Sequence, residues 1–357
     1  MSRLKIGILF GGASSEYEVS LLSASSVLTH INREKYDIVM LGITKDGRWL
    51  RYRGDIDDIR FDRWAESGNT APAVVSPDRA VHGVMEILPD GRTVSIRLDA
   101  VFPVMHGKNS EDGTLQGLFT VAGIPFVGCD TLSCALCMDK ALARTITDNA
   151  GIPSTAWDWF YADALSDFAA LETRLVQKLG YPMFIKPANA GSSVGVSRAT
   201  DTQSLRTAIE LALEHDKKVV AEQAVIGQEV ECAVLGNDSP ITSMVGEIAP
   251  VAEFYDYNAK YIDNTTNLYI PARISGEIAQ TVRDMAARSY RALCCTGLSR
   301  VDFFVKKDGT VLLNEINTIP GFTHISMYPK LFEATGIPYP ELIDRLITLA
   351  LERKFLI

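Results

Sequence analysis

One hairpin near the carboxyl end constrains this chain more than any other segment. Two runs rich in β-branched and aromatic residues, 299–305 and 311–317, flank a short polar connection. The connection contains Asp308-Gly309, and Asp-Gly is the dipeptide that favours a two-residue hairpin turn. We therefore expect two antiparallel strands joined by a tight turn at these two residues.

This turn determines which residues of the two strands face each other. Asp302 is expected opposite Glu315, and Arg300 opposite Asn317, with all four side chains on one face. Two opposed carboxylates repel unless one is protonated or a cation lies between them, and carboxylate and amide oxygens suit Mg²⁺. The hairpin therefore indicates either a magnesium site or two surface carboxylates beside a turn. A one-residue bulge would break the expected register.

The first part of the chain alternates strand and helix signals in a βαβ pattern. This pattern predicts an α/β fold with a mostly parallel sheet covered by helices. The expected elements are strands 5–10, 37–44, 100–105 and 124–127 and helices 15–31 and 113–122. A capping box, Ser15-x-x-Glu18, is expected to begin the first helix, and one long helix is expected over 131–150.

The second part carries helix and strand signals in a less regular order, which predicts an α+β arrangement. Its expected elements are helices 167–179, 201–215 and 276–295 and strands 183–186, 218–223, 229–236 and 242–249. A polar and aromatic loop of about 251–268 is long for a compact domain, and such loops are usually functional.

Three segments outside the hairpin carry candidate site residues. The loop 188–195, after Lys186, is rich in small residues whose backbone N–H groups can bind an anion, although it is not a Walker A motif. His106 follows a strand end, where α/β proteins bind ligands, and Glu16 lies in a first helical turn. Taken alone, these features are more simply interpreted as a flexible surface turn, a structural histidine and an acid placed by the helix dipole.

Composition narrows the class of protein. The chain has 357 residues, which predicts two or three domains, and a net charge of −9 without any Lys/Arg-rich run. This acidity argues against nucleic-acid binding and against binding to an acidic membrane surface. No signal peptide and no apolar run of about 18 residues is found, so a cytoplasmic protein is expected. The six cysteines, including Cys134-x-x-Cys137, are expected to be buried free thiols.

Seven motifs in order along the chain are those of one enzyme family. They are Phe10-Gly-Gly-Ala-Ser-Ser-Glu-Tyr-Glu-Val-Ser20, His106-Gly107 with Glu111-Asp112-Gly113-Thr114, Met138-Asp139-Lys140, Gly191-Ser-Ser-Val-Gly195, Phe254-Tyr-Asp-Tyr-Asn-Ala-Lys-Tyr261, Arg300-Val-Asp302 and Asn314-Glu-Ile-Asn-Thr-Ile-Pro-Gly321. With these motifs the chain resembles the D-alanine-D-alanine ligases of the ATP-grasp superfamily. The resemblance implies a Rossmann-like pre-ATP-grasp domain at 1–128 and ATP-grasp subdomains at 129–222 and 223–357.

The resemblance also implies a reaction. ATP phosphorylates the carboxylate of one D-alanine, and the amine of a second D-alanine attacks this acyl phosphate to give a dipeptide for peptidoglycan synthesis. Two Mg²⁺ ions per site are implied, with Mn²⁺ as a substitute, in a cytoplasmic homodimer. Such phosphoryl transfer depends mainly on positioning and on charge neutralisation.

Specific residues match the functional positions of the family. Positions for magnesium correspond to Asp302, Glu315 and Asn317, and positions for the nucleotide correspond to Lys140, Lys186, Ser193, Gly195, Glu222, Val225, Glu229 and Asn314. Glu16 matches the group that binds the first ammonium, with Ser192 and Tyr261 as its partners. Arg300 and the backbone N–H of Gly321 match the oxyanion stabilisers. The remaining substrate positions correspond to His106, Tyr255, Lys260, Ser326 and Met327.

Two subgroups of the family differ in the second substrate. The amino-terminal half, including 128–140, resembles the vancomycin-resistance ligases that make D-alanyl-D-serine. Those ligases tend to carry Phe at the position of Tyr255 and Arg at that of Met327, so these two residues resemble the D-alanine type. A D-alanine-D-alanine ligase is therefore expected, with a D-alanine-D-serine ligase as the alternative.

Overall fold

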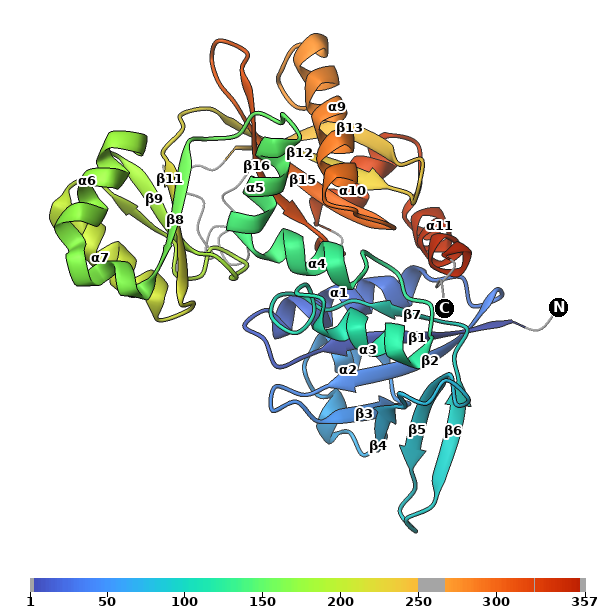
Figure 1. Cartoon of the computed structure of the whole chain (residues 1–357). Helices are drawn as coiled ribbons and strands as arrows, with labels where there is room; N and C mark the ends of the chain where they lie inside the picture. Colours follow the sequence, from blue (N-terminus) through green and yellow to red (C-terminus); the bar gives the residue numbers. More distant parts are fainter. Residues whose placement is uncertain (1–2, 250–266, 324, 354–357) are drawn as a thin grey trace.

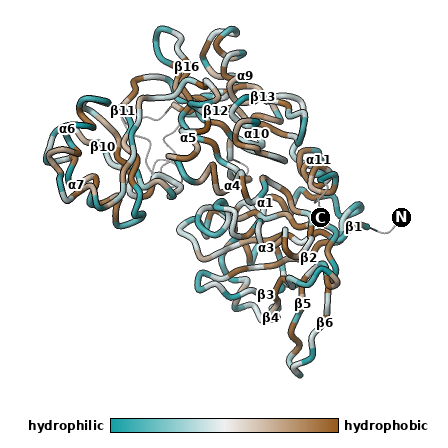
Figure 2. The backbone as a smooth tube through the Cα atoms, in the orientation of Figure 1, coloured by the Kyte–Doolittle hydropathy of each residue, from teal (hydrophilic) through white to brown (hydrophobic). Residues whose placement is uncertain are grey.

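The fold was analysed in a computed structural model that describes residues 3–249, 267–323 and 325–353. Within these ranges the chain forms a seven-stranded, a four-stranded and a five-stranded sheet, which follow one another along the sequence (Figure 1). Apolar stretches run through the strands and the helices packed on them, and hydrophilic stretches gather at loops and chain ends (Figure 2). No helix in the described part is long and apolar enough to span a bilayer.

The amino-terminal sheet has the strand order β6-β5-β4-β3-β2-β1-β7. Its strands are β1 Leu4–Gly11, β2 Tyr36–Ile43, β3 Trp49–Tyr52, β4 Thr70–Val75, β5 Gly83–Ile87, β6 Thr93–Arg97 and β7 Ala100–Pro103. Only β2, β1 and β7 pair in parallel, so the prediction of a mostly parallel sheet was wrong. Strands β3 to β6 follow one another without a long crossover helix, and such strands pair antiparallel.

Helices cover this sheet and connect it to the rest of the chain. They are α1 Tyr17–His30, α2 Ile56–Arg60 and α3 Thr114–Ala122, with a short 3₁₀ turn at Trp64–Glu66. The expected capping box of the first helix is absent: Glu16 is the N-cap residue and makes no side-chain cap, while Glu18 pairs with Lys45. The Glu16 carboxylate is therefore not used to cap its own helix.

The helix expected over 131–150 is divided in two. It consists of α4 Thr131–Met138 and α5 Lys140–Asn149, separated by Asp139 in an extended conformation. The Asp139 carboxylate accepts hydrogen bonds from the N–H groups of Ala141 and Leu142, both at 3.1 Å, and pairs with Lys218. Aspartate is a preferred N-cap residue, so it begins a new helix here and makes Lys140 the first residue of α5.

The central sheet is antiparallel, in the order β10-β9-β11-β8. Its strands are β8 Trp157–Tyr161, β9 Met183–Pro187, β10 Ser197–Ala199 and β11 Lys218–Gln223, and its helices are the 3₁₀ turn Ala162–Asp167, α6 Phe168–Leu179 and α7 Thr202–Leu213. The sheet and its helices share a separate hydrophobic core. Aspartates cap both α-helices, with a complete capping box at Asp201 and Ser204.

The carboxyl-terminal sheet has the order β14-β13-β12-β15-β16. Its strands are β12 Gln228–Leu235, β13 Ile241–Ala249, β14 Asn267–Tyr269, β15 Leu298–Val305 and β16 Val311–Asn317, and its helices are α9 Gly276–Ala292, α10 Met327–Ala334 and α11 Tyr339–Glu352. Side chains of α10 and α11 share one hydrophobic core with β1 and α1. The first and third sheets are thereby packed together through these helices.

The hairpin between β15 and β16 differs from the expected two-residue turn. Val305 pairs with Val311, the Lys306 N–H donates to the Thr310 carbonyl at 2.9 Å, and Gly309 has a φ of +84°. This is a three-residue loop that ends on a left-handed glycine, so the predicted turn was wrong. A bulge at Asn314 then restores the expected register beyond it.

The cysteines agree largely with the prediction. All six are free, and five are buried, while Cys294 is exposed. Within the described ranges, no cluster of three or more His, Cys, Asp or Glu side chains could hold a metal ion. Most of the long loop expected at 251–268 lies outside the described residues, and its last two residues begin β14.

Candidate active site

A cavity of about 970 Å³ lies between the amino-terminal and carboxyl-terminal sheets. The loop that follows β9 also reaches it, through Gly191 and Ser192. Many of the side chains predicted from the sequence line this one cavity: Glu16, His106, Ser192, Glu229, Arg300, Asp302, Asn314, Glu315, Asn317, Gly321, Ser326 and Met327. The cavity therefore gathers residues that are up to about three hundred positions apart in the chain.

The predicted face of the hairpin forms the charged centre of the cavity. Asp302 pairs with Glu315, and Arg300 pairs with Asn317, as the sequence predicted. The Arg300 guanidinium donates to both Asp302 oxygens at 2.8 and 2.7 Å, and the Asn317 amide donates to Asp302 at 3.1 Å. Glu231 on the neighbouring strand β12 forms a further ion pair with Arg300 at 3.1 Å.

This arrangement keeps Arg300 charged. Burial by itself would lower the pKa of the guanidinium, but Asp302 and Glu231 outweigh burial and raise that pKa well above its ordinary value. Sequence reasoning missed Glu231, although a second acid two positions after Glu229, on the same face of a strand, is a detectable signal.

The donor atoms of this face fit a hard divalent cation. Asp302, Glu315 and Asn317 all line the cavity and carry carboxylate or amide oxygens, which are the ligands that Mg²⁺ prefers. Among the described residues the buried Asn314 Oδ1 has no hydrogen-bond partner, so it is a further acceptor oxygen beside these residues. The residues present therefore fit a magnesium ion, although the metal role itself stays a prediction.

Glu16 and its neighbours form the second polar group of the cavity. The Ser192 hydroxyl donates a hydrogen bond to Glu16, and Ser192 holds a left-handed φ of +50° that directs the loop toward this carboxylate. Gly107 lies against Glu16, since a Cβ on Gly107 would be 3.1 Å from the Glu16 Oε2 atom. The sequence predicted the pairing of Glu16 with Ser192, whereas Tyr261 lies outside the described residues.

Glu111 is a cavity residue to which sequence reasoning gave no role. Its carboxylate accepts a hydrogen bond from the Gly107 N–H at 2.8 Å and faces the same cavity as Glu16. Burial, and then the nearby Glu16 carboxylate, raise the pKa of Glu111 to about 8. The Glu111 carboxyl group is therefore mostly protonated near neutral pH. The available signal was its place beside Asp112 in a family motif.

His106 is a buried and neutral member of the site. Its Nδ1 lies 3.0 Å from the Ile319 carbonyl oxygen and its Nε2 lies 3.2 Å from the Ser23 hydroxyl. Burial lowers the pKa of His106 to about 4, against a smaller opposite effect of the Ile319 bond. Because both ring nitrogens have protein partners, the structure supports a structural role for this histidine at the cavity wall.

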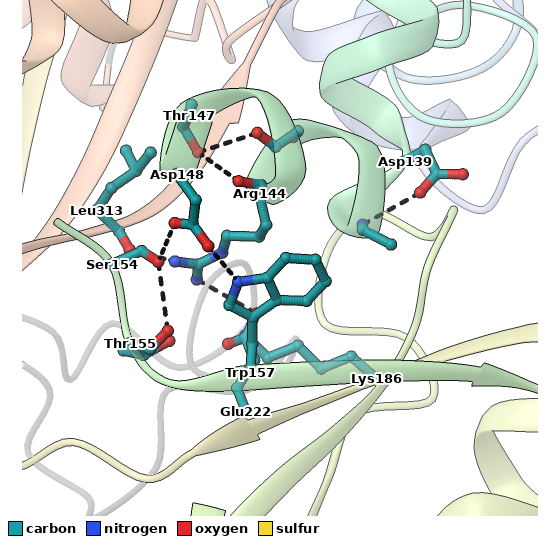
Figure 3. Close-up of polar contacts among 12 residues, drawn as sticks. Asp139, Arg144, Thr147, Asp148, Ser154, Thr155, Trp157, Lys186, Glu222 and Leu313 are labelled. Atoms are coloured by element: carbon teal, nitrogen blue, oxygen red, sulfur yellow. Dashed lines mark hydrogen bonds and ion pairs between the residues drawn. The ribbon is translucent and has the colours of Figure 1, made fainter. Parts of the chain in front are cut away.

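Several residues predicted for the nucleotide lie outside the large cavity, with Lys140 on α5 and Lys186 and Glu222 on the central sheet. Lys140 Nζ donates to the Ala190 carbonyl at 2.6 Å, and Lys186 Nζ lies 2.6 Å from Glu222, as Figure 3 shows for the second pair. Burial would raise the pKa of Glu222, but Lys186 and Arg144 lower it below its ordinary value. Glu222 is therefore an ionised, buried carboxylate.

The other predicted nucleotide residues lie in the segments around this pair. Ser193 and Gly195 both have left-handed φ values, of +59° and +70°, and a Cβ on Gly195 would be 2.5 Å from the His215 ring. Val225 is partly buried in the connection from β11 to β12, and Glu229 reaches the large cavity from β12. The loop after β9 is thus tightly shaped rather than a loose surface turn.

The residues predicted for the second substrate gather at the start of α10. The Ser326 hydroxyl accepts from the Thr323 N–H at 3.0 Å, and a Cβ on Gly321 would be only 2.9 Å from that hydroxyl oxygen. Met327 is buried against Gly246 and lines the cavity with its apolar side chain. Tyr255 and Lys260 lie outside the described residues.

Comparison with known proteins identifies the family. The family models described as "D-ala D-ala ligase N-terminus" and "D-ala D-ala ligase C-terminus" match residues 5–129 and 146–348. The chain belongs to the D-alanine-D-alanine ligase family. This family member has the ATP-grasp type of fold, with the three sheets described above.

Relatives match this ligase family member along nearly its whole length. The D-alanine–D-alanine ligase of Caldicellulosiruptor bescii is 48% identical over 356 residues, which covers 99% of this chain and 97% of the relative. That of Acetivibrio thermocellus is 48% identical and covers 98% of this chain and 96% of the relative.

Two solved structures are also similar. The VanG D-Ala:D-Ser ligase from Enterococcus faecalis has a TM-score of 0.90 at 46% identity and covers 98% of this chain and 100% of that chain. The D-alanine-D-alanine ligase from Coxiella burnetii has a TM-score of 0.87 at 33% identity, with coverages of 99% and 95%.

Proposed function

We propose that this family member is an ATP-dependent ligase that joins two D-alanines through a D-alanyl phosphate. The observation that carries the proposal is the single cavity in which Glu16, Arg300 and the acidic face of β15 and β16 meet. The relatives named as D-alanine–D-alanine ligases support the same activity. We also propose a cytoplasmic homodimer, and domains at 1–128, 129–222 and 223–357, on the family resemblance alone.

The site residues divide the reaction between them. ATP transfers its γ-phosphoryl group to a carboxylate oxygen of the first D-alanine, whose ammonium is bound by Glu16. The amine of the second D-alanine, after losing a proton, attacks the carbonyl carbon, and negative charge develops on the carbonyl oxygen, where Arg300 and the Gly321 N–H would stabilise it. The tetrahedral intermediate then collapses, the bond to the phosphate oxygen breaks, and inorganic phosphate leaves. Asp302 and Glu231 raise the pKa of Arg300 well above its ordinary value, so the guanidinium is charged for this role.

Asp302, Glu315 and Asn317 would hold Mg²⁺, which neutralises phosphate charge when it is bound. Without such a cation, Asp302 and Glu315 would repel the incoming triphosphate. The Asp302 carboxylate now faces Arg300 and Asn317, so its oxygens are already oriented by two donors. Lys140 and Lys186 would contact the nucleotide phosphates.

The second substrate is proposed to be D-alanine. Met327 brings an apolar, buried side chain to the proposed second-substrate region and offers a serine hydroxyl no strong hydrogen-bonding group. A site without a hydrogen-bonding partner for the serine hydroxyl cannot favour D-serine over D-alanine, whose side chain is the smaller methyl group. Selectivity for D-serine would therefore need an added polar contact. The similarity to the VanG D-Ala:D-Ser ligase keeps D-serine as the second candidate.

The test offers ATP, Mg²⁺, D-alanine and an equal concentration of D-serine to the purified protein. Phosphate release and dipeptide masses are then measured, and D-alanyl-D-alanine is expected as the main product. Absence of phosphate release would overturn the ligase proposal. A predominant mixed dipeptide would overturn only the assignment of the second substrate.

The metal proposal has its own variant. Glu315→Gln removes a candidate ligand charge and is expected to abolish turnover. Glu341→Gln changes an exposed acid on α11, outside the cavity lining, and serves as the matched control. Turnover of Glu315→Gln at the rate of the control would reject the hairpin as the metal site.

A further inference from the structure

Arg144 connects three parts of the molecule that lie far apart in the sequence. It projects from α5 and is only 2% exposed. One terminal nitrogen donates to the Leu313 carbonyl on β16 at 2.7 Å, and the other lies 3.2 Å from Glu222 on β11 (Figure 3). A buried arginine with two such acceptors holds its fork geometry at a defined place.

Arg144 and Lys186 share the carboxylate of Glu222. Arg144 binds Oε1 of Glu222, while Lys186 from β9 binds Oε2 at 2.6 Å. Both oxygens of this buried acid are therefore occupied, and its orientation depends on both cations. Loss of either partner would leave part of a buried charge uncompensated, which strongly perturbs such a group.

The contact with Leu313 lies directly before the bulge in β16. Among the described residues this strand is the edge of its sheet, and only an isolated parallel bridge between Ser154 and Leu313 lies on its outer side. The Leu313 N–H donates to the Pro153 carbonyl at 2.8 Å, and the Leu313 carbonyl accepts a hydrogen bond from Arg144. The next residue is the bulged Asn314, followed by Glu315. Arg144 thus secures the strand just before its register shifts.

Helix α5, which carries Arg144, is itself held in place by side-chain hydrogen bonds. Asp148, one turn further along, accepts from Trp157 Nε1 at 2.7 Å and from the Ser154 hydroxyl at 2.8 Å (Figure 3). These bonds connect α5 to the strand β8 and to the segment preceding it. The helix therefore links the central sheet to the edge of the carboxyl-terminal sheet.

We propose that Arg144 is a positioning residue for nucleotide binding. It holds Glu222 and Lys186 on the central sheet in register with Asn314 and Glu315 on β16, without lining the large cavity itself. The proposal rests on the proposed function, because it takes these residues to surround ATP. It predicts a loss of nucleotide affinity on removal of Arg144, with little change in D-alanine affinity.

The experiment compares Arg144→Met, Arg144→Lys and the wild-type protein. ADP affinity, measured by calorimetry in the presence of Mg²⁺, is expected to fall by about 10- to 100-fold in Arg144→Met, in line with a lost charged hydrogen bond. The KM for ATP should rise similarly while the KM for D-alanine stays within about twofold of wild type. Lysine keeps the charge but reaches one acceptor, so Arg144→Lys should recover part of the affinity.

A matched control separates positioning from stability. Arg51→Met removes one arginine from the buried Glu86 in the amino-terminal sheet, and is expected to lower Tm without changing ADP affinity. Unchanged ADP affinity in Arg144→Met, or equal increases in both KM values, would overturn the proposal. Should Arg144→Met fail to fold, Arg144→Lys is titrated alone, and wild-type ADP affinity there would overturn the proposal.

The ADP titration needs neither amino acid nor turnover. A wild-type protein that binds ADP but releases no phosphate with D-alanine would refute the proposed function. The comparison of ADP affinities would still decide the role of Arg144.

Discussion

His106 allows a quantitative prediction about acid stability. In the folded protein its pKa is about 4, mainly because of burial, whereas the ordinary value is 6.5. Between these values the unfolded chain binds a proton that the folded protein does not, so stability falls as the pH falls from 6.5 to 4. The full difference corresponds to about 3 kcal/mol, of which about 2 kcal/mol is lost at pH 5.

The perturbation is His106→Gln, which keeps one donor and one acceptor for Ile319 and Ser23 but has no charge to gain. Thermal unfolding is measured at pH 7.5 and pH 5.0 for the wild type, for this variant and for His30→Gln. His30 is exposed at the end of α1 and serves as the control histidine.

The comparison concerns how much Tm falls on acidification, so a constant cost of the substitution cancels. Wild type and His30→Gln should lose about 3 °C more than His106→Gln, because only they retain the buried histidine. If the Tm of His106→Gln falls as much as that of the wild type, the buried neutral histidine does not contribute and the reasoning is refuted.

Two further predictions concern the folded state. Gly42→Ala would place a methyl group 2.3 Å from the buried Trp64 ring, so the free energy of unfolding, measured by urea titration, should fall by about 1–3 kcal/mol. Gly276→Ala has open space around the added methyl group and serves as the control, which should not be destabilised. Equal free energies of unfolding for the two variants would contradict the packing of Trp64 against Gly42. Burial and the Glu16 carboxylate raise the pKa of Glu111 to about 8, so between pH 4.5 and pH 8 the folded protein keeps a proton that the unfolded chain loses, and this contribution to stability falls as the pH rises. Relative to Glu111→Gln, the Tm of the wild type should therefore fall between pH 5 and pH 8, and equal changes in Tm would argue against a protonated Glu111.

The hairpin shows how far sequence reasoning reached and where it failed. The predicted turn was one residue too short, which by itself would have misplaced every pair beyond it. The bulge at Asn314 compensates, so Asp302 does face Glu315. Neither irregularity has a clear signal in the residues, because Asp-Gly suits two-residue and three-residue loops alike. The correct pairing was therefore reached through two errors that cancel.

Other parts followed from the sequence to the extent that they depend on local signals. Glu16, Ser192, Arg300 and Asp302, which the motifs assigned to one site, do line one cavity, because a family motif carries its position in the fold. Arg144 was missed because its partners, Glu222 and Leu313, come from strands whose proximity only the tertiary structure reveals. The antiparallel strands β3 to β6 were missed because residues 49–97 have only short, weak strand patterns.

The bulge in β16 also changes the spacing of the polar side chains that the strand directs toward the cavity. In a regular strand, side chains on one face recur every second residue, about 7 Å apart. Asn314 and Glu315 both line the cavity, so two consecutive residues contribute to it, with Cα atoms about 3.8 Å apart. Three of the four residues 314–317 thus reach the cavity, while Ile316 stays in the core. One inserted residue therefore adds a polar group to the site and leaves the packing of the sheet intact.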